Sequence, residues 1–198
     1  MPHYFDDAPV APSRPGQVNL KLPDFEATLT VDRGVFSVGG IDPGTIELLR
    51  APTASPRDGD LLDLGCGYGP IAMTLAHRCP GATVWAVDVN ARALELAATN
   101  ASALGLADRV RVATPDGVPD HVSFAGIWSN PPIRIGKPAL HDLLLRWLPR
   151  LAVGGSAWLV VQKHLGADSL ASWLERQGHP VRRVGSRKGY RILEVSPA

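Results

Sequence analysis

The chain has 198 residues, 45% hydrophobic and 20% charged, with a formal net charge of +1. This is the profile of one ordinary globular domain over residues 1–198, and the net charge by itself does not indicate nucleic-acid binding. The two cysteines are too few for a disulfide framework or a metal cluster, and no apolar run reaches about 18 residues. We therefore expect a cytoplasmic protein with no metal and no membrane partner.

The N-terminal part of the chain predicts a cap rather than a domain. Residues 1–40 form this expected cap, and residues 41–198 form the expected catalytic core. The first 16 residues contain four prolines and indicate an irregular arm. Short strands are expected at 18–22 and 26–31. A helix should follow, with Asp42 as its N-cap, and it should end before residue 52.

From residue 61 onwards, apolar runs alternate with helical stretches. The expected strands lie near 61–64, 84–87, 109–112, 124–129 and 156–161, and the expected helices near 70–78, 91–104, 138–148 and 167–177. A terminal hairpin is expected from 181–184 and 191–195. This order predicts a doubly wound, Rossmann-like α/β fold with a seven-stranded sheet, mostly parallel, whose ligand cleft lies outside the carboxyl ends of the strands.

A glycine-rich loop follows the first core strand. Gly65, Gly67 and Gly69 come directly after Asp63 and before a helix that begins with Pro70. Glycines let a ligand lie against bare main chain, and the helix start offers free N–H groups. The G-x-G-x-G spacing after an acid favours S-adenosylmethionine over a nicotinamide dinucleotide, which requires G-x-G-x-x-G. A tight turn without a ligand is the structural alternative.

Two acids follow later strands. Asp88 comes about 20 residues after the glycines and is placed to accept both ribose hydroxyls, because Asn90 can cap the next helix in its place. The alternative makes Asp88 itself the cap. Asp116 could bind the adenine amino group, with a plain Asp-Gly turn as the alternative. Val89, beside Asp88, completes this part of the expected cofactor site.

The strand predicted at 124–129 ends in Asn130, Pro131 and Pro132. Two prolines make a rigid loop at the mouth of the cleft. The Asn130 carboxamide oxygen and the Pro131 carbonyl could accept the N–H groups of an amine on a base ring and aim its lone pair at a methyl group. This would be catalysis by positioning. The structural alternative is a loop terminator.

Together these motifs resemble those of amino-group methyltransferases. The chain resembles the small-domain family that includes the small-subunit ribosomal RNA guanine-N2 methyltransferases, over nearly its whole length. The matching segments are 3–5, 34–37, 42–45, 130–137, 161–164 and 188–190. The resemblance implies methyl transfer from S-adenosylmethionine to the exocyclic N2 of guanine in ribosomal RNA. It also implies that Phe36 and Ser37 line the cofactor cleft, with Asn130 contacting both cofactor and amine.

Substrate contacts are expected from Ile133, Arg134 and Lys137, the last two through phosphates. Ile133 replaces the aromatic residue usual in the family, which reduces stacking on the target base. The two-domain members have an additional N-terminal domain that this chain lacks, so RNA recognition is expected from one domain, a homodimer or a partner.

Several alternatives stay open. The acceptor could be adenine N6, a protein glutamine or a small-molecule amine, or the chain could be a non-catalytic module that binds cofactor and RNA. The arginines and lysine between 176 and 191 fit either phosphate contacts or a solvated basic face.

Overall fold

The computed structural model describes residues 12–35, 39–53, 56 and 58–198. Its strands are β1 (Gly16–Lys21), β2 (Glu26–Val31), β3 (Asp58–Leu64), β4 (Gly81–Val87), β5 (Val110–Ala113), β6 (Phe124–Ser129), β7 (Leu151–Gln162), β8 (Val181–Arg187) and β9 (Tyr190–Val195). Its α-helices are α1 (Pro43–Arg50), α2 (Pro70–Arg78), α3 (Ala91–Ala103), α4 (Lys137–Trp147) and α5 (Ala167–Arg176). Short 3-10 turns lie at Pro115–Gly117, Ile133–Ile135, Leu148–Arg150 and Lys163–Leu165.

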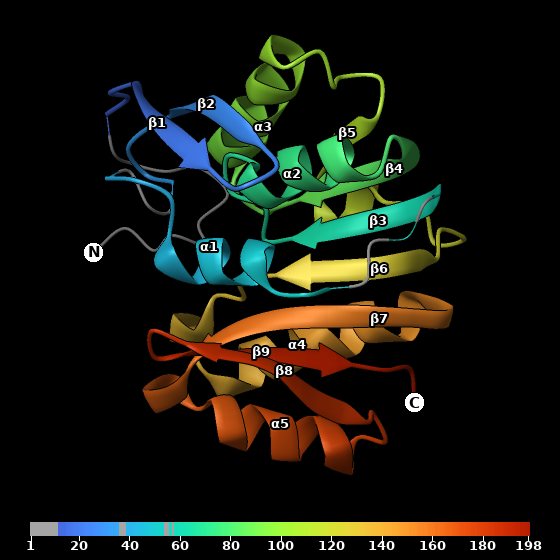
Figure 1. Ribbon diagram of the computed structural model, residues 1–198. Coiled ribbons are helices and arrows are strands. Elements are labelled where there is room, and N and C mark those ends of the chain that lie inside the picture. The colour runs from blue at the N-terminus through green and yellow to red at the C-terminus, as the bar shows by residue number, and fades with distance from the viewer. Residues whose placement is uncertain (1–11, 36–38, 54–55, 57) are drawn as a thin grey trace.

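One twisted sheet organises the molecule (Figure 1). Its strand order is β5-β4-β3-β6-β7-β9-β8. The strands from β5 to β7 pair in parallel, whereas β9 runs antiparallel to both β7 and β8. Strands β1 and β2 form a separate antiparallel hairpin. The predicted Rossmann-like, seven-stranded sheet with an antiparallel end and an N-terminal cap is confirmed.

Helices cover both faces of the sheet, because neighbouring strand residues point to opposite sides. Leu61 of β3 joins the core cluster shared with α1, α2, α3 and the β1–β2 hairpin. Leu62 and Leu64 join the cluster shared with α4 and α5. The apolar runs of β4 and of β3, which only Asp63 interrupts after Leu61, are therefore the expected pattern of strands buried on both faces.

The predicted elements match the observed ones with shifts at their ends. The helix expected at 70–78 is α2 itself, and α3 ends one residue before the expected limit of 104. Strand β7 begins five residues before the apolar run at 156–161. Its early part is irregular in register and includes the fully exposed Val153, so no apolar pattern marks it.

The hairpin is fastened to the core through a buried amide. Asn100 of α3 accepts a hydrogen bond from the backbone N–H of Thr30 in β2 at 2.8 Å and donates to its carbonyl at 3.0 Å. The same side chain donates to the carbonyl of Tyr68 at 2.9 Å. One residue thereby links the hairpin, α3 and the loop after β3. In the described part of the chain, no helix is long and apolar enough to cross a bilayer.

A packed tryptophan pair leaves no room for a side chain at Gly126. Trp128 and Trp158 stack with ring centroids 4.4 Å apart, and a Cβ at Gly126 would lie 2.5 Å from Cζ3 of Trp128. Both rings are buried and have little room to move. We expect Gly126→Ala to lower the free energy of unfolding by about 1–3 kcal/mol, as overpacking does. Urea denaturation measures this change.

Gly16→Ala is the matched control. A Cβ at Gly16 would lie 3.7 Å from Cγ2 of Val31, an ordinary contact, so its effect should stay within about 0.5 kcal/mol. Equal effects of the two substitutions would show that the tryptophan pair adapts.

Candidate functional site

The strand order reverses at β3, which places three loops side by side. Strands β4 and β5 lie on one side of β3, and β6 and β7 lie on the other. Leu64 pairs with Val87 of β4, and Asp63 pairs with Trp128 of β6. The glycine loop, Asp88 and Asn130 therefore all begin at the carboxyl ends of adjacent strands. A reversal of this kind is where open α/β sheets form ligand crevices.

The glycine loop is locked to the end of β4. The N–H groups of Gly65 and Cys66 donate to the carbonyl of Val87 at 2.8 and 3.0 Å. The next N–H, from Gly67, donates to Oδ2 of Asp88 at 2.9 Å. Gly67 has a φ of +56°, in the left-handed region that favours glycine. The loop conformation thus depends on both glycine and a carboxylate from the neighbouring strand.

Asp63 is fully buried beneath this loop. Its Oδ2 accepts a hydrogen bond from the backbone N–H of Ala72, in the first turn of α2, at 2.8 Å. Its Oδ1 has no partner among the described residues. Burial raises the pKa of Asp63 from 3.8 to about 8, against the lowering effect of the Ala72 bond and with a small addition from Asp88. A buried acceptor without a donor is costly, and a ligand with an N–H group would relieve it.

Asp88 is also buried, and burial raises the pKa of its carboxyl. Hydrogen bonds from the N–H groups of Asn90 and Gly67 oppose that rise in pKa. The N-cap of α3 is Asn90, whose side chain accepts from the N–H of Ala93 at 3.3 Å. Asp88 is therefore not the cap, and its carboxylate, which also accepts a backbone hydrogen bond from Val89, retains acceptor capacity for a ligand hydroxyl. Val89 beside it is exposed.

Asn130 is half-buried at the end of β6. Its Nδ2 donates to Oδ1 of Asp42 at 2.7 Å and to Oγ1 of Thr45 at 3.1 Å, both at the start of α1. None of the described residues donates to its carboxamide oxygen. The carbonyl of Pro131 accepts the N–H of Ile133 at 2.8 Å, which leaves it one further lone pair. The following residue, Pro132, is half-buried.

The structure does not bring the other predicted site residues together as closely as Asp63, Asp88 and Asn130. Asp116 is exposed, and its Oδ1 accepts from Arg146 at 2.7 Å, as in a surface turn. Ile133 packs its partly buried side chain against the core under α4 and α5. Lys137 is exposed and lies 3.4 Å from the hydroxyl of Ser169. The predictions for Phe36, Ser37 and the side chain of Arg134 fall outside the described residues.

The C-terminal basic residues mostly contact carboxylates. Arg182 pairs with Glu194, and Arg191 pairs with Asp168. Lys188 lies 3.1 Å from the buried Glu47. These ion pairs favour a structural role for those side chains over phosphate contacts.

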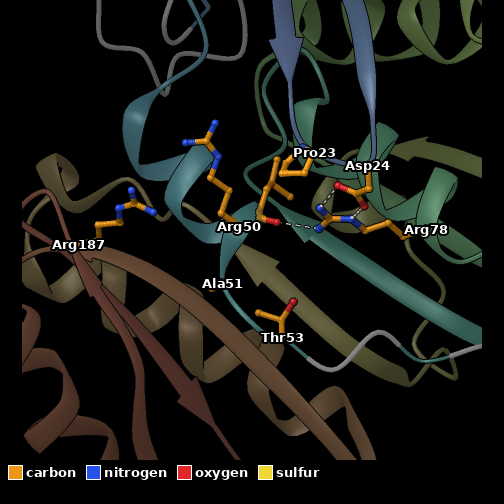
Figure 2. A pocket seen from close by; sticks show the side chains of 8 residues that line it. Pro23, Asp24, Arg50, Ala51, Thr53, Arg78 and Arg187 are labelled. Atoms are coloured by element: carbon orange, nitrogen blue, oxygen red, sulfur yellow. Dashed lines mark hydrogen bonds and ion pairs between the residues drawn. The ribbon is translucent and has the colours of Figure 1, made fainter.

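A cavity of about 610 Å³ lies at the C-terminal end of α1 (Figure 2). Its lining is Pro23, Asp24, Leu49, Arg50, Ala51, Thr53, Arg78 and Arg187. Arg78 closes one side by donating to both oxygens of Asp24 at 2.7 and 2.9 Å. Along α1, Leu49 at the cavity lies four residues, or about 6 Å, beyond Thr45, which contacts Asn130. It is distinct from the crevice at the glycine loop.

The sequence does not predict that Asp42 and Thr45 belong to this site. It predicts Asp42 as the N-cap of α1, which is confirmed because its Oδ1 accepts from the N–H groups of Gly44 and Thr45 at 2.8 and 3.1 Å. The contact with Asn130 spans 88 residues, and no local pattern signals it. Within the described residues, no group of three or more His, Cys, Asp or Glu side chains is arranged to hold a metal ion.

Comparison with known proteins places these features in a family. Residues 26–194 match the family described as "Methyltransferase small domain". The chain is 35% identical over 196 residues to the uncharacterized protein YbxB of Bacillus subtilis, covering 98% of this chain and 97% of that protein. It is 36% identical over 182 residues to the ribosomal RNA small subunit methyltransferase C of Pseudomonas aeruginosa, covering 89% of this chain and 53% of that protein.

One solved structure has the same fold over nearly the whole chain. It is the 16S rRNA N2 G1207 methyltransferase of T. thermophilus in complex with AdoMet and guanosine, with a TM-score of 0.80 and 24% identity. The match covers 94% of this chain and 52% of that one. The chain thus spans about half the length of the ribosomal RNA methyltransferases that it matches.

The buried carboxyl of Asp63 makes stability depend on pH. Between 3.8 and about 8 the native carboxyl keeps a proton that the unfolded one has lost, so the free energy of unfolding falls as pH rises through this range. Asp63→Asn removes this titration. We expect its stability relative to wild type to grow from pH 5 to pH 8, by at most about 1.4 kcal/mol per pH unit.

Urea titrations of ligand-free protein at several pH values measure this difference. Asn19→Ala, which replaces an exposed and uncharged side chain on β1, is the control and should keep the pH dependence of the wild type. A constant offset between Asp63→Asn and the wild type would contradict the raised pKa.

Proposed function

The chain belongs to the methyltransferase small domain family, and from that premise we propose that it methylates the exocyclic N2 amine of a guanine in ribosomal RNA. Membership confirms the family that the motifs indicate, and it makes the chain an S-adenosylmethionine-dependent methyltransferase. The guanine acceptor and the residues that hold each group are the proposed part.

The residues at the end of β3 fit S-adenosylmethionine. The buried Oδ1 of Asp63 lacks a partner among the described residues, and when the carboxyl is ionised an amino group is the kind of donor that it requires. The loop Gly65–Gly69 presents bare main chain at the start of α2, which suits a carboxylate. Asp88 would accept the ribose hydroxyls. Val89, Asp116, Phe36 and Ser37 remain proposed neighbours of the cofactor.

The proposed chemistry needs little from the protein beyond positioning. S-adenosylmethionine supplies a methyl group that is already activated for attack by a nucleophile. An amine on a base ring shares its lone pair with the ring, which makes it a weak nucleophile. The carboxamide oxygen of Asn130 and the second lone pair of the Pro131 carbonyl would accept its two N–H groups. This would hold the amine in place, with Pro132 stiffening the loop. As the new N–C bond forms and the methyl–sulfur bond breaks, the amine nitrogen would become positively charged and would release one N–H proton to solvent.

The observation that carries the proposal is the position of Asn130. Its amide nitrogen is bound by α1, and its oxygen accepts no bond from the described residues, one strand away from the glycine loop. The names of two relatives support guanine in ribosomal RNA as the acceptor: one is a ribosomal RNA small subunit methyltransferase C, and the other was solved with guanosine.

RNA contact is proposed for the segment after the two prolines. Lys137 is exposed at the start of α4, where it can reach a phosphate. Arg134 would act in the same way. Ile133 would touch the base only with the part of its side chain that the core leaves uncovered, so stacking contributes less than an aromatic residue would.

Methyl transfer to RNA tests the proposal directly. Purified protein is incubated with radiolabelled S-adenosylmethionine and with RNA or protein from cells lacking the gene, and the products are hydrolysed to nucleosides or amino acids. We expect label in N2-methylguanosine. We expect Asn130→Ala to lower kcat by about 100-fold, because the amine is no longer positioned.

Asn19→Ala, on the exposed face of β1, is the matched control and should keep wild-type kcat. Label in N6-methyladenosine or in protein glutamine would move the acceptor to those groups. Full activity of Asn130→Ala would remove its assigned role.

Cofactor binding provides an independent test of Asp88. We expect Asp88→Ala to raise the Kd for S-adenosylmethionine about tenfold or more, because the ribose loses an acceptor and the N–H of Gly67 loses its partner. Isothermal titration calorimetry measures the Kd. Asp108→Ala, in an exposed turn, should bind as the wild type does. Unchanged affinity of Asp88→Ala would reject the ribose role.

A further inference from the structure

The first turn of α1 holds the side chain of Asn130. Nδ2 of Asn130 donates to Oδ1 of Asp42 and to Oγ1 of Thr45, at 2.7 and 3.1 Å. The same oxygen of Asp42 accepts the backbone N–H groups of Gly44 and Thr45. Oδ1 of Asp42 therefore both caps α1 and accepts the hydrogen bond from Asn130.

This arrangement allows only one orientation of the amide. An asparagine side chain can be turned over, which exchanges its oxygen and its nitrogen. A carboxylate oxygen accepts hydrogen bonds and donates none, so the turned-over amide would set two acceptors against each other. Asp42 therefore keeps the nitrogen of Asn130 towards α1 and turns its oxygen away from the helix. Thr45 provides a second anchor for the same nitrogen.

Helix α1 is itself held in place by the sheet, so its first turn can hold the side chain of Asn130 in one position. It packs on β7 and β9, and its Glu47 is buried and contacts Lys188 in the β8–β9 turn at 3.1 Å. A Cβ at Gly44 would lie 2.8 Å from the ring of Tyr190, so that ring packs directly on the first turn. Gln162 donates to the hydroxyl of Tyr190 at 2.9 Å. The first turn is thereby held from the far end of the sheet.

We propose that Asp42 and Thr45 are positioning residues for methyl transfer: they fix the amide of Asn130 so that its oxygen is presented to the acceptor amine. The inference rests on the proposed function, because it requires Asn130 to hold that amine. Neither residue contacts the acceptor in this arrangement. Their effect is on the orientation of a side chain that does.

Two substitutions separate positioning from helix capping. Asp42→Ser keeps a side chain that caps helices well, yet its hydroxyl is too short to reach Asn130. Thr45→Val keeps the shape of threonine and removes its hydroxyl. Thr99→Val is the matched control, because the hydroxyl of Thr99, on the exposed side of α3, bonds the carbonyl of Glu95 and no other described residue.

Three quantities are measured on each full-length variant: kcat for methyl transfer to RNA, the Kd for S-adenosylmethionine, and the side-chain amide signals of Asn130 in ¹⁵N NMR spectra. Those signals are assigned by their loss in Asn130→Ala. We expect Asp42→Ser and Thr45→Val each to lower kcat about tenfold and to shift the amide signals, while the Kd changes by less than threefold. Thr99→Val should match the wild type in all three.

A wild-type kcat in both Asp42→Ser and Thr45→Val would overturn the inference, whether or not the amide signals move. Loss of cofactor binding in step with kcat would also overturn it, because a general structural effect would then explain the result. If Asp42→Ser does not fold, Thr45→Val decides alone. A wild-type protein that methylates no acceptor would defeat the proposed function, and the amide signals would then show separately whether the contact forms.

Discussion

The parallel pairing of β3 with β6 is the constraint on which the candidate site depends. These strands lie far apart in the chain, yet the hydroxyl of Ser129 donates to the carbonyl of Leu64, 65 residues away, at 2.7 Å. Because β4 occupies the other edge of β3, the loops after all three strands open at one place. Without this pairing, the position of Asn130 relative to the glycine loop would not be fixed.

Two buried carboxylates shape the glycine loop, and both are unfavourable there in isolation. Burial raises the pKa of Asp63 and of Asp88, which means that the fold disfavours their charged forms. The backbone N–H groups of Ala72, Gly67 and Asn90 offset only part of this cost. Perturbed acids of this kind gather at functional sites, where a ligand supplies the missing donors. Stability and ligand binding are therefore coupled at this loop.

Helix α1 links the C-terminal hairpin to the candidate site at Asn130. Its last turn lines the cavity that includes Arg50 and Arg187 (Figure 2). Its first turn holds the side chain of Asn130. The antiparallel strands at the end of the sheet support it through Lys188 and Tyr190. The C-terminal hairpin is thus more than an edge to the sheet, because it supports the helix that orients an amide two strands away.

The sequence by itself determined the elements and their order and, apart from the start of β7, their ends to within three residues. Local patterns suffice for this: apolar runs mark β3 and β4, glycines mark the loop, and Asp42 before Pro43 marks the start of α1. Tertiary structure alone decided that Asp42 faces Asn130 and that Asp116 faces Arg146. Contacts between residues distant in the chain depend on how strands pair and helices pack, and that information belongs to the whole fold rather than to any segment.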